Sequence, residues 1–205
     1  MKKKIITKIS EGLGNQLFMY ANSYSLCKKN NFDHYIDSLS GYYQKKHMHD
    51  FILDRFYISA KTASKKFSFE NPYKNLFRKV LIFFDKFSVN KKFFFEKKNN
   101  NKTSEYFPLD LSKAYNYFFI DGNFESEKYF HDCRDDLLNE FDIKDKKKFF
   151  DNKYLDIIKK NNVVSICVRQ NRFSERIKNK YSSSDKDKSL LFVKKTIDYI
   201  NKAIE

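Results

Sequence analysis

The chain has few residues of the kinds that bend or cross-link a polypeptide: it contains four glycines, two prolines and three cysteines, and no tryptophan. Cys27, Cys133 and Cys167 are odd in number and far apart, which argues against a disulfide framework and fits a reducing compartment. The N-terminal Met-Lys-Lys-Lys leads directly into a short apolar run, without the longer apolar segment of a signal peptide. We therefore expect a protein that folds without disulfides in the cytoplasm.

Long apolar runs are also missing from the sequence. No stretch reaches the roughly 18 consecutive apolar residues that a membrane-crossing helix needs. A hydrophobic content of 41%, with 18% aromatic residues, nevertheless argues for a folded chain rather than a disordered one. We expect a protein that is either soluble or peripheral at the inner face of the membrane.

The net charge of +15 raises the question of a nucleic-acid partner, because basic surfaces attract phosphate chains. The excess is almost all lysine, spread along the chain, in a composition typical of AT-rich codons. We therefore expect no nucleic-acid partner, and note attraction to anionic lipid as a second meaning of the charge. The six arginines are Arg55, Arg78, Arg134, Arg169, Arg172 and Arg176.

The most informative segment is a predicted strand, turn and helix at the N-terminus, with the strand at 4–10 and the helix at 15–30. Gly12 and Gly14 permit a close approach of the backbone to a ligand, or a positive φ. Asn15 stands where a helix N-cap is expected, and amide groups at a helix start favour anionic ligands. The candidate substrate-binding residues here are Gly12, Gly14, Asn15 and Gln16.

Two phosphate-binding motifs do not match this turn. A P-loop needs a lysine followed by serine or threonine, which are missing at the required positions. A dinucleotide-binding fingerprint needs a third glycine, and Leu17 occupies that position. An ordinary tight turn between a strand and a helix remains the alternative.

The rest of the chain alternates between further predicted strands and helices. Apolar residues from Leu76 to Phe87 recur at helical spacing with lysines opposite, and we expect this face to join the core. The alternative is a helix that lies on a membrane surface. Ser126 is a candidate helix cap. Strands are predicted near 34–37, 117–120 and 162–168. Helices are predicted after the 121–130 segment to about residue 141, near 154–160 and near 187–204.

Several segments resemble one family. The string Gly-Leu-Gly-Asn-Gln-Leu-Phe at 12–18, followed by Tyr20-Ala21, resembles the opening of the bacterial α-1,2-fucosyltransferases, glycosyltransferase family 11. Glu11 stands where that family has a further glycine. Residues 53–56 and 121–130 are similar to two later segments of the family.

The run at 163–173 resembles the strand that in this family ends in His-x-Arg-Arg-x-Asp. Arg169 falls on the first arginine, which the resemblance implies holds the donor β-phosphate and acts in catalysis. Cys167 and Gln170 replace the histidine and the second arginine, while Arg172, in place of the aspartate, is a second candidate phosphate contact. The alternative is that these arginines pair with nearby acids such as Glu175.

The resemblance implies an α/β protein of the GT-B type. Residues 1–150 would form an N-terminal Rossmann-like domain on the acceptor side, and residues 151–205 the start of a Rossmann-like nucleotide-sugar-binding domain, which we expect to be incomplete. The implied reaction is inverting transfer of fucose from GDP-fucose to a glycan hydroxyl in surface polysaccharide synthesis. A degenerate, non-catalytic protein that binds a glycan or a partner is the alternative.

No metal or other cofactor is expected. The Asp-Lys-Asp sequence at 185–187 is similar to a metal-binding motif of other transferases, but it lies in a polar segment rather than after an apolar strand. His47 and His49 have no cysteine or acid at the spacing of a metal site. The GT-B resemblance also implies that an arginine takes the place of a divalent cation at the diphosphate.

Overall fold

The computed structural model describes residues 2–43, 49–97, 106–146, 156–159, 194, 195 and 197. The chain divides into two units, Met1–Phe149 and Phe150–Glu205. In the second unit, residues 156–159, 194, 195 and 197 are helical. The predicted strand at 162–168, which carries Cys167 and leads to Arg169, lies outside the described residues.

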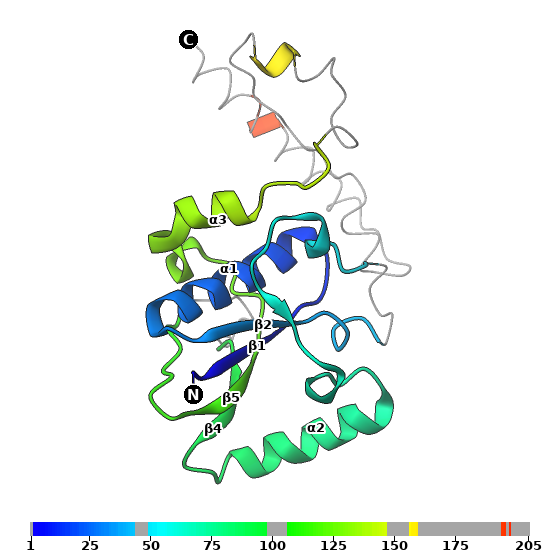
Figure 1. Cartoon of the computed structure of the whole chain (residues 1–205), viewed down its shortest axis with the longest axis vertical. Coiled ribbons are helices and arrows are strands. Elements are labelled where there is room, and N and C mark those ends of the chain that lie inside the picture. Colours follow the sequence, from blue (N-terminus) through cyan, green and yellow to red (C-terminus); the bar gives the residue numbers. More distant parts are fainter. Residues whose placement is uncertain are drawn as a thin grey trace. The chain divides into compact units, whose positions relative to one another are not determined.

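The first unit is built on a five-stranded parallel sheet (Figure 1). The strand order is β3-β2-β1-β5-β4, so the N-terminal strand lies at the centre. Ile6 of β1 lies opposite both Tyr35 of β2 and Phe119 of β5. This confirms the α/β class and is compatible with a Rossmann-like fold. The strands are β1 (Lys4–Lys8), β2 (Asp33–Asp37), β3 (Lys61–Thr62), β4 (Lys91–Phe95) and β5 (Ala114–Asp121).

The central strand is apolar because both of its faces are covered. Ile5, Ile6 and Thr7 are all buried, although they alternate between the two sides of the sheet. Ile5 faces a core that also contains Phe118, Ile120 and Cys27. The opposite face carries a cluster of aromatic rings, in which the centroids of Phe93 and Phe119 are 5.1 Å apart.

Helix α1 (Leu13–Asn30) covers the first of these faces together with α3 (Arg134–Glu140), while α2 (Pro72–Asp85) lies on the other side of the sheet (Figure 1). The predicted end of α1 is confirmed, because Asn31 adopts a left-handed conformation with φ 53° directly after it. In the described ranges, no helix has the combination of length and apolar character needed to cross a membrane.

The helix predicted to run to about Phe141, with Ser126 as its candidate cap, is not continuous. The structure divides it into η3 (Glu127–Tyr129), η4 (His131–Cys133) and α3, because Phe130 has a non-helical backbone with φ −147° and ψ 12°. The Ser126 side chain does accept a hydrogen bond from the Lys128 amide at the start of η3, as a cap. The remaining 3-10 helices are η1 (Leu53–Arg55) and η2 (Lys65–Phe67).

Candidate functional site

The turn that follows β1 lies at the carboxyl edge of the parallel sheet, where open α/β sheets bind their ligands. In the sheet, β1 pairs with β2 on one flank and with β5 on the other. A close backbone approach supports this turn, because a Cβ atom added at Gly41 would lie 2.1 Å from the Ile9 carbonyl oxygen. The strand–turn–helix segment therefore stands where this fold class places a ligand.

The residue with positive φ in this turn is Glu11, at 64°. Of the two uses considered for Gly12 and Gly14, a positive φ is not found: Gly12 has φ −77° and serves as the N-cap of α1 by its position. Asn15 is likewise not the N-cap, because the helix begins at Leu13 and the Gln16 amide already bonds to the Gly12 carbonyl at 3.1 Å. The Asn15 side chain donates instead to the Glu11 carboxylate.

Gly14 leaves an open surface on the first turn of α1. It is exposed, and in the described part of the chain no atom beyond its chain neighbours and the backbone of α1 lies within 4 Å of the position that a Cβ atom would take. No internal packing contact therefore requires glycine here. The first turn contains no acidic residue, and no side chain caps it, so its amide groups favour an anionic ligand.

Gln16 is fully buried, and its side chain connects the turn after β1 to the 50–52 segment. Its Nε2 donates to the carbonyl oxygens of Glu11 (2.9 Å) and Asp50 (2.8 Å), and its Oε1 accepts from the Ile52 amide (3.0 Å). Both amide hydrogens are thus used within the chain. In this structure Gln16 positions the turn and the 50–52 segment; the predicted contact with substrate stays a prediction.

A group of charged side chains at the same edge was not found by sequence reasoning. Asp121, the last residue of β5, pairs with Lys8 of β1 at 2.7 Å and with Arg78 of α2 at 2.6 Å. The Arg78 guanidinium also lies 5.8 Å from the ring centroids of Phe69 and Phe93. Lys8 and Asp121 could have been found, because both end strands whose carboxyl ends share one edge.

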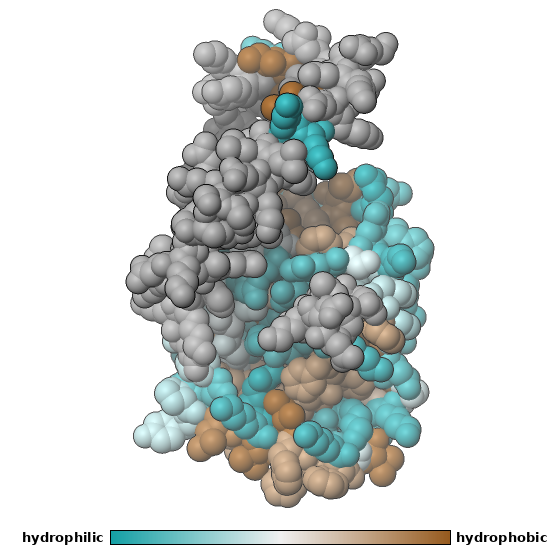
Figure 2. Space-filling view, turned by 180° about the vertical axis from the view of Figure 1, so that it is seen from behind, coloured by the Kyte–Doolittle hydropathy of each residue, from teal (hydrophilic) through white to brown (hydrophobic). Residues whose placement is uncertain are grey.

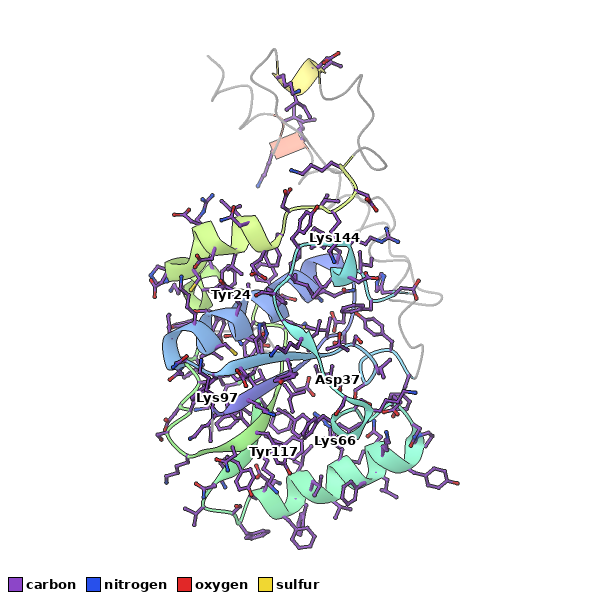
Figure 3. All side chains as sticks on the ribbon, in the orientation of Figure 1. Tyr24, Asp37, Lys66, Lys97, Tyr117 and Lys144 are labelled. Atoms are coloured by element: carbon purple, nitrogen blue, oxygen red, sulfur yellow. The ribbon has the colours of Figure 1, made fainter. Side chains whose placement is uncertain are left out.

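The loop after β5 is held by a buried carboxylate. Glu96 accepts hydrogen bonds from the amides of Asn123 (2.8 Å) and Phe124 (3.0 Å). Gly122 is required here, since a Cβ atom would lie 2.3 Å from the Glu96 Cβ. Asp37 has the same function after β2, where it accepts from the amides of Leu39 and Ser40 (Figure 3).

Burial raises the pKa of the Asp37 carboxyl, partly offset by its hydrogen bonds to Ser40. Burial also raises the pKa of Tyr42, whose hydroxyl lies 3.3 Å from the Glu11 carbonyl. Since Tyr42 is a neutral donor to the turn at physiological pH, it adds no negative charge beside the start of α1. At this edge of the sheet, an anionic ligand could therefore meet the amides at the start of α1. The two nearby cations, Lys8 and Arg78, both already pair with Asp121.

The structure brings Gly12, Gly14, Asn15 and Gln16 together at the start of α1. Arg169 and Arg172 lie outside the described residues, as do His47 and the 185–187 segment, while His49 is exposed. No group of three or more metal-ligating side chains occurs among the residues that the structure describes. Comparisons of this chain with protein-family models, curated proteins and solved structures found no match.

Proposed function

We propose that this chain is a nucleotide-sugar glycosyltransferase of the GT-B type, most similar to the α-1,2-fucosyltransferases. It would transfer fucose from GDP-fucose, with inversion, to a hydroxyl of a glycan acceptor. The observation that carries the proposal is the open first turn of α1 at the carboxyl edge of the parallel sheet. The family-like string at 12–18 supplies that turn.

The roles in the proposed reaction follow from charge. As GDP leaves, negative charge grows on its β-phosphate, and a bidentate arginine stabilises that charge more strongly than it binds the ground state. We assign this role to Arg169, with Arg172 as a second cation. The backbone of Gly14 and the amides beside it would bind a polar or anionic group of the substrates, positioned by Gln16.

Gly14→Ala offers a sharp test of a ligand at this turn. Alanine favours a helix over glycine, and nothing in the described chain crowds the site, so we expect unfolding to require about 0.5–1 kcal/mol more. If a substrate contacts the backbone here, the same methyl group lowers substrate affinity, as measured by saturation-transfer NMR with GDP-fucose and acceptor glycans. A variant with higher stability and unchanged affinity would show that the turn does not contact either substrate.

Turnover is tested by GDP release from GDP-fucose with a panel of galactoside acceptors. Arg169→Ala is expected to lower the rate by about 10²–10³-fold, the usual loss for one anion-stabilising donor. Arg134→Ala, an exposed arginine at the start of α3, is the matched control and should leave the rate unchanged. Equal losses in both variants would contradict the assignment of Arg169.

The departures from the family motif favour a second candidate, a non-catalytic protein that binds a glycan or a partner. With cysteine at 167 and glutamine at 170, this chain lacks the motif's histidine and its second arginine, two side chains that can carry positive charge. For an enzyme, the double change Cys167→His and Gln170→Arg should tighten GDP binding. Glycan binding without GDP release, in both the natural chain and this variant, would favour the second candidate.

A further inference from the structure

Helix α2 turns its apolar side away from the sheet. Seven large apolar side chains on one side of this helix and its C-terminal extension are between 44 and 86% exposed. They recur at intervals of three and four residues, so they form one continuous stripe along the helix. The expectation that this face joins the core is therefore wrong. The stripe consists of Tyr73, Leu76, Phe77, Val80, Phe83, Phe84 and Phe87.

Polar contacts on the opposite side of α2 set this rotation. Arg78 pairs with Asp121 and lies over the aromatic rings of the sheet. Asp85, the last residue of α2, accepts hydrogen bonds from the β4 amides of Lys92 (2.8 Å) and Phe93 (3.2 Å). Because Arg78 and Asp85 are seven residues apart, they share one side of the helix and hold the stripe outward.

The charge around the stripe is mostly positive. Residues 72–92 contain six lysines and arginines and a single acid, Asp85, which is buried. Of these cations, Lys74 pairs with Glu70, and Arg78 pairs with Asp121 on the side that faces the sheet. Lys79 and Lys86 are exposed and stand about 100° from the middle of the stripe on the helix. In Figure 2, apolar side chains gather with hydrophilic ones among them in the lowest part of the view, where Figure 1 draws α2. Figure 3 shows side chains projecting there away from the sheet.

We propose that α2 is a membrane-docking helix, which lies in the surface of an anionic lipid bilayer with its aromatic stripe among the acyl chains. An apolar stripe flanked by lysines fits lipid that is apolar below and negatively charged at its surface. A second copy of the chain fits less well, since each copy would bring the same excess of cations to the contact. This inference does not depend on the proposed function.

The absence of tryptophan from the chain permits a direct measurement. In Phe84→Trp, the one indole reports the environment of the stripe. With vesicles of phosphatidylcholine and phosphatidylglycerol, we expect its emission to shift to shorter wavelength and brominated acyl chains to quench it. Tyr57→Trp is the matched control, because Tyr57 is 56% exposed but lies outside α2, and its emission should not change.

Two double variants separate the apolar and electrostatic contributions. Phe77→Ser with Phe84→Ser should lower the partition onto anionic vesicles at least about tenfold, against no change for Tyr57→Ser with Leu138→Ser. Lys79→Glu with Lys86→Glu should also weaken binding, and more so at low salt, whereas Lys128→Glu with Lys144→Glu should not. If the first pair alters folding, Leu76→Ser with Phe83→Ser replaces it.

Each outcome supports or overturns the proposal. Emission shift, quenching by brominated lipid and loss of binding in the α2 variants alone support it. Failure to bind anionic vesicles, or equal binding by the α2 variants, overturns it. Emission that is already at short wavelength without vesicles also overturns it, because protein then covers the stripe. In that case a concentration-dependent mass in light scattering identifies a second copy, and its absence identifies another part of this chain.

Discussion

The guanidinium of Arg78 donates a hydrogen bond of 2.6 Å to the carboxylate of Asp121, which links α2 to the last residue of β5. The two residues are 43 positions apart in sequence. Since Lys8 pairs with the same carboxylate, the contact joins α2 to both β1 and β5 at the edge that carries the candidate site.

We expect Arg78→Leu to destabilise the protein by about 1–2 kcal/mol. The loss is smaller than for a fully buried pair, because both side chains are about one-fifth exposed and Lys8 still neutralises Asp121. Urea unfolding measures the change. Lys74→Leu, which removes a more exposed pair with Glu70, is the control and should cost no more than about 0.5 kcal/mol. Equal costs would show that Arg78 does not fix α2.

Gln16→Leu should cost about 3 kcal/mol, because it leaves two carbonyl oxygens and one amide without their buried partner. Thermal unfolding of the purified variant measures the effect. Asn15→Ala, one residue earlier on the same turn and half-buried, is the matched control with an expected cost below about 1 kcal/mol. A stable Gln16→Leu protein would contradict the positioning role and leave Gln16 available as a ligand contact.

At position 11, glycine should give a more stable protein than alanine, the reverse of the order found inside helices. Glu11 has φ 64°, which costs a residue with a Cβ atom about 1 kcal/mol, so we expect Glu11→Gly to be more stable than Glu11→Ala by about that amount. Both changes remove the bond to Asn15, so this loss cancels in the comparison. At Lys79, inside α2, the alanine variant should be more stable than the glycine variant. If alanine is also the more stable at position 11, Glu11 is not left-handed.

His34 should make the protein sensitive to mild acid. Burial lowers the pKa of its imidazole from 6.5 to about 3. Its Nε2 lies 2.8 Å from the Ser23 hydroxyl, the Tyr20 ring packs against it, and its Nδ1 has no hydrogen-bond partner within the described chain. Below pH 6.5 the unfolded chain therefore takes up a proton that the folded chain does not.

The stability due to His34 is complete above pH 6.5 and is lost as the pH falls towards 3, by about 1.4 kcal/mol per pH unit. We expect a loss of about 2 kcal/mol between pH 6.5 and 5, measured by urea unfolding at each pH. His34→Gln should lose less over this interval, while His131→Gln, at an exposed site, should behave like the natural chain. Parallel pH profiles for His34→Gln and the natural chain would refute the assignment.

The sequence by itself determined the α/β class, three of the strands and the first helix. Apolar runs between polar turns indicated β1, β2 and β5, and the lysine and asparagine residues at 28–31 marked the end of α1. It also placed a glycine-containing turn at the carboxyl edge of the sheet. These features are local, because each depends on residues within about one turn or strand of one another.

Only the tertiary structure decided what these segments contact. Helical periodicity showed that α2 has an apolar side, but which side meets the sheet depends on Arg78 and on Asp121, a partner on a distant strand. For Gln16, the sequence predicted a site residue, and only the fold showed that its side-chain amide also bonds to the 50–52 segment. The left-handed conformation fell on Glu11 rather than on a glycine, because the path from β1 into α1 sets φ there and residue type does not.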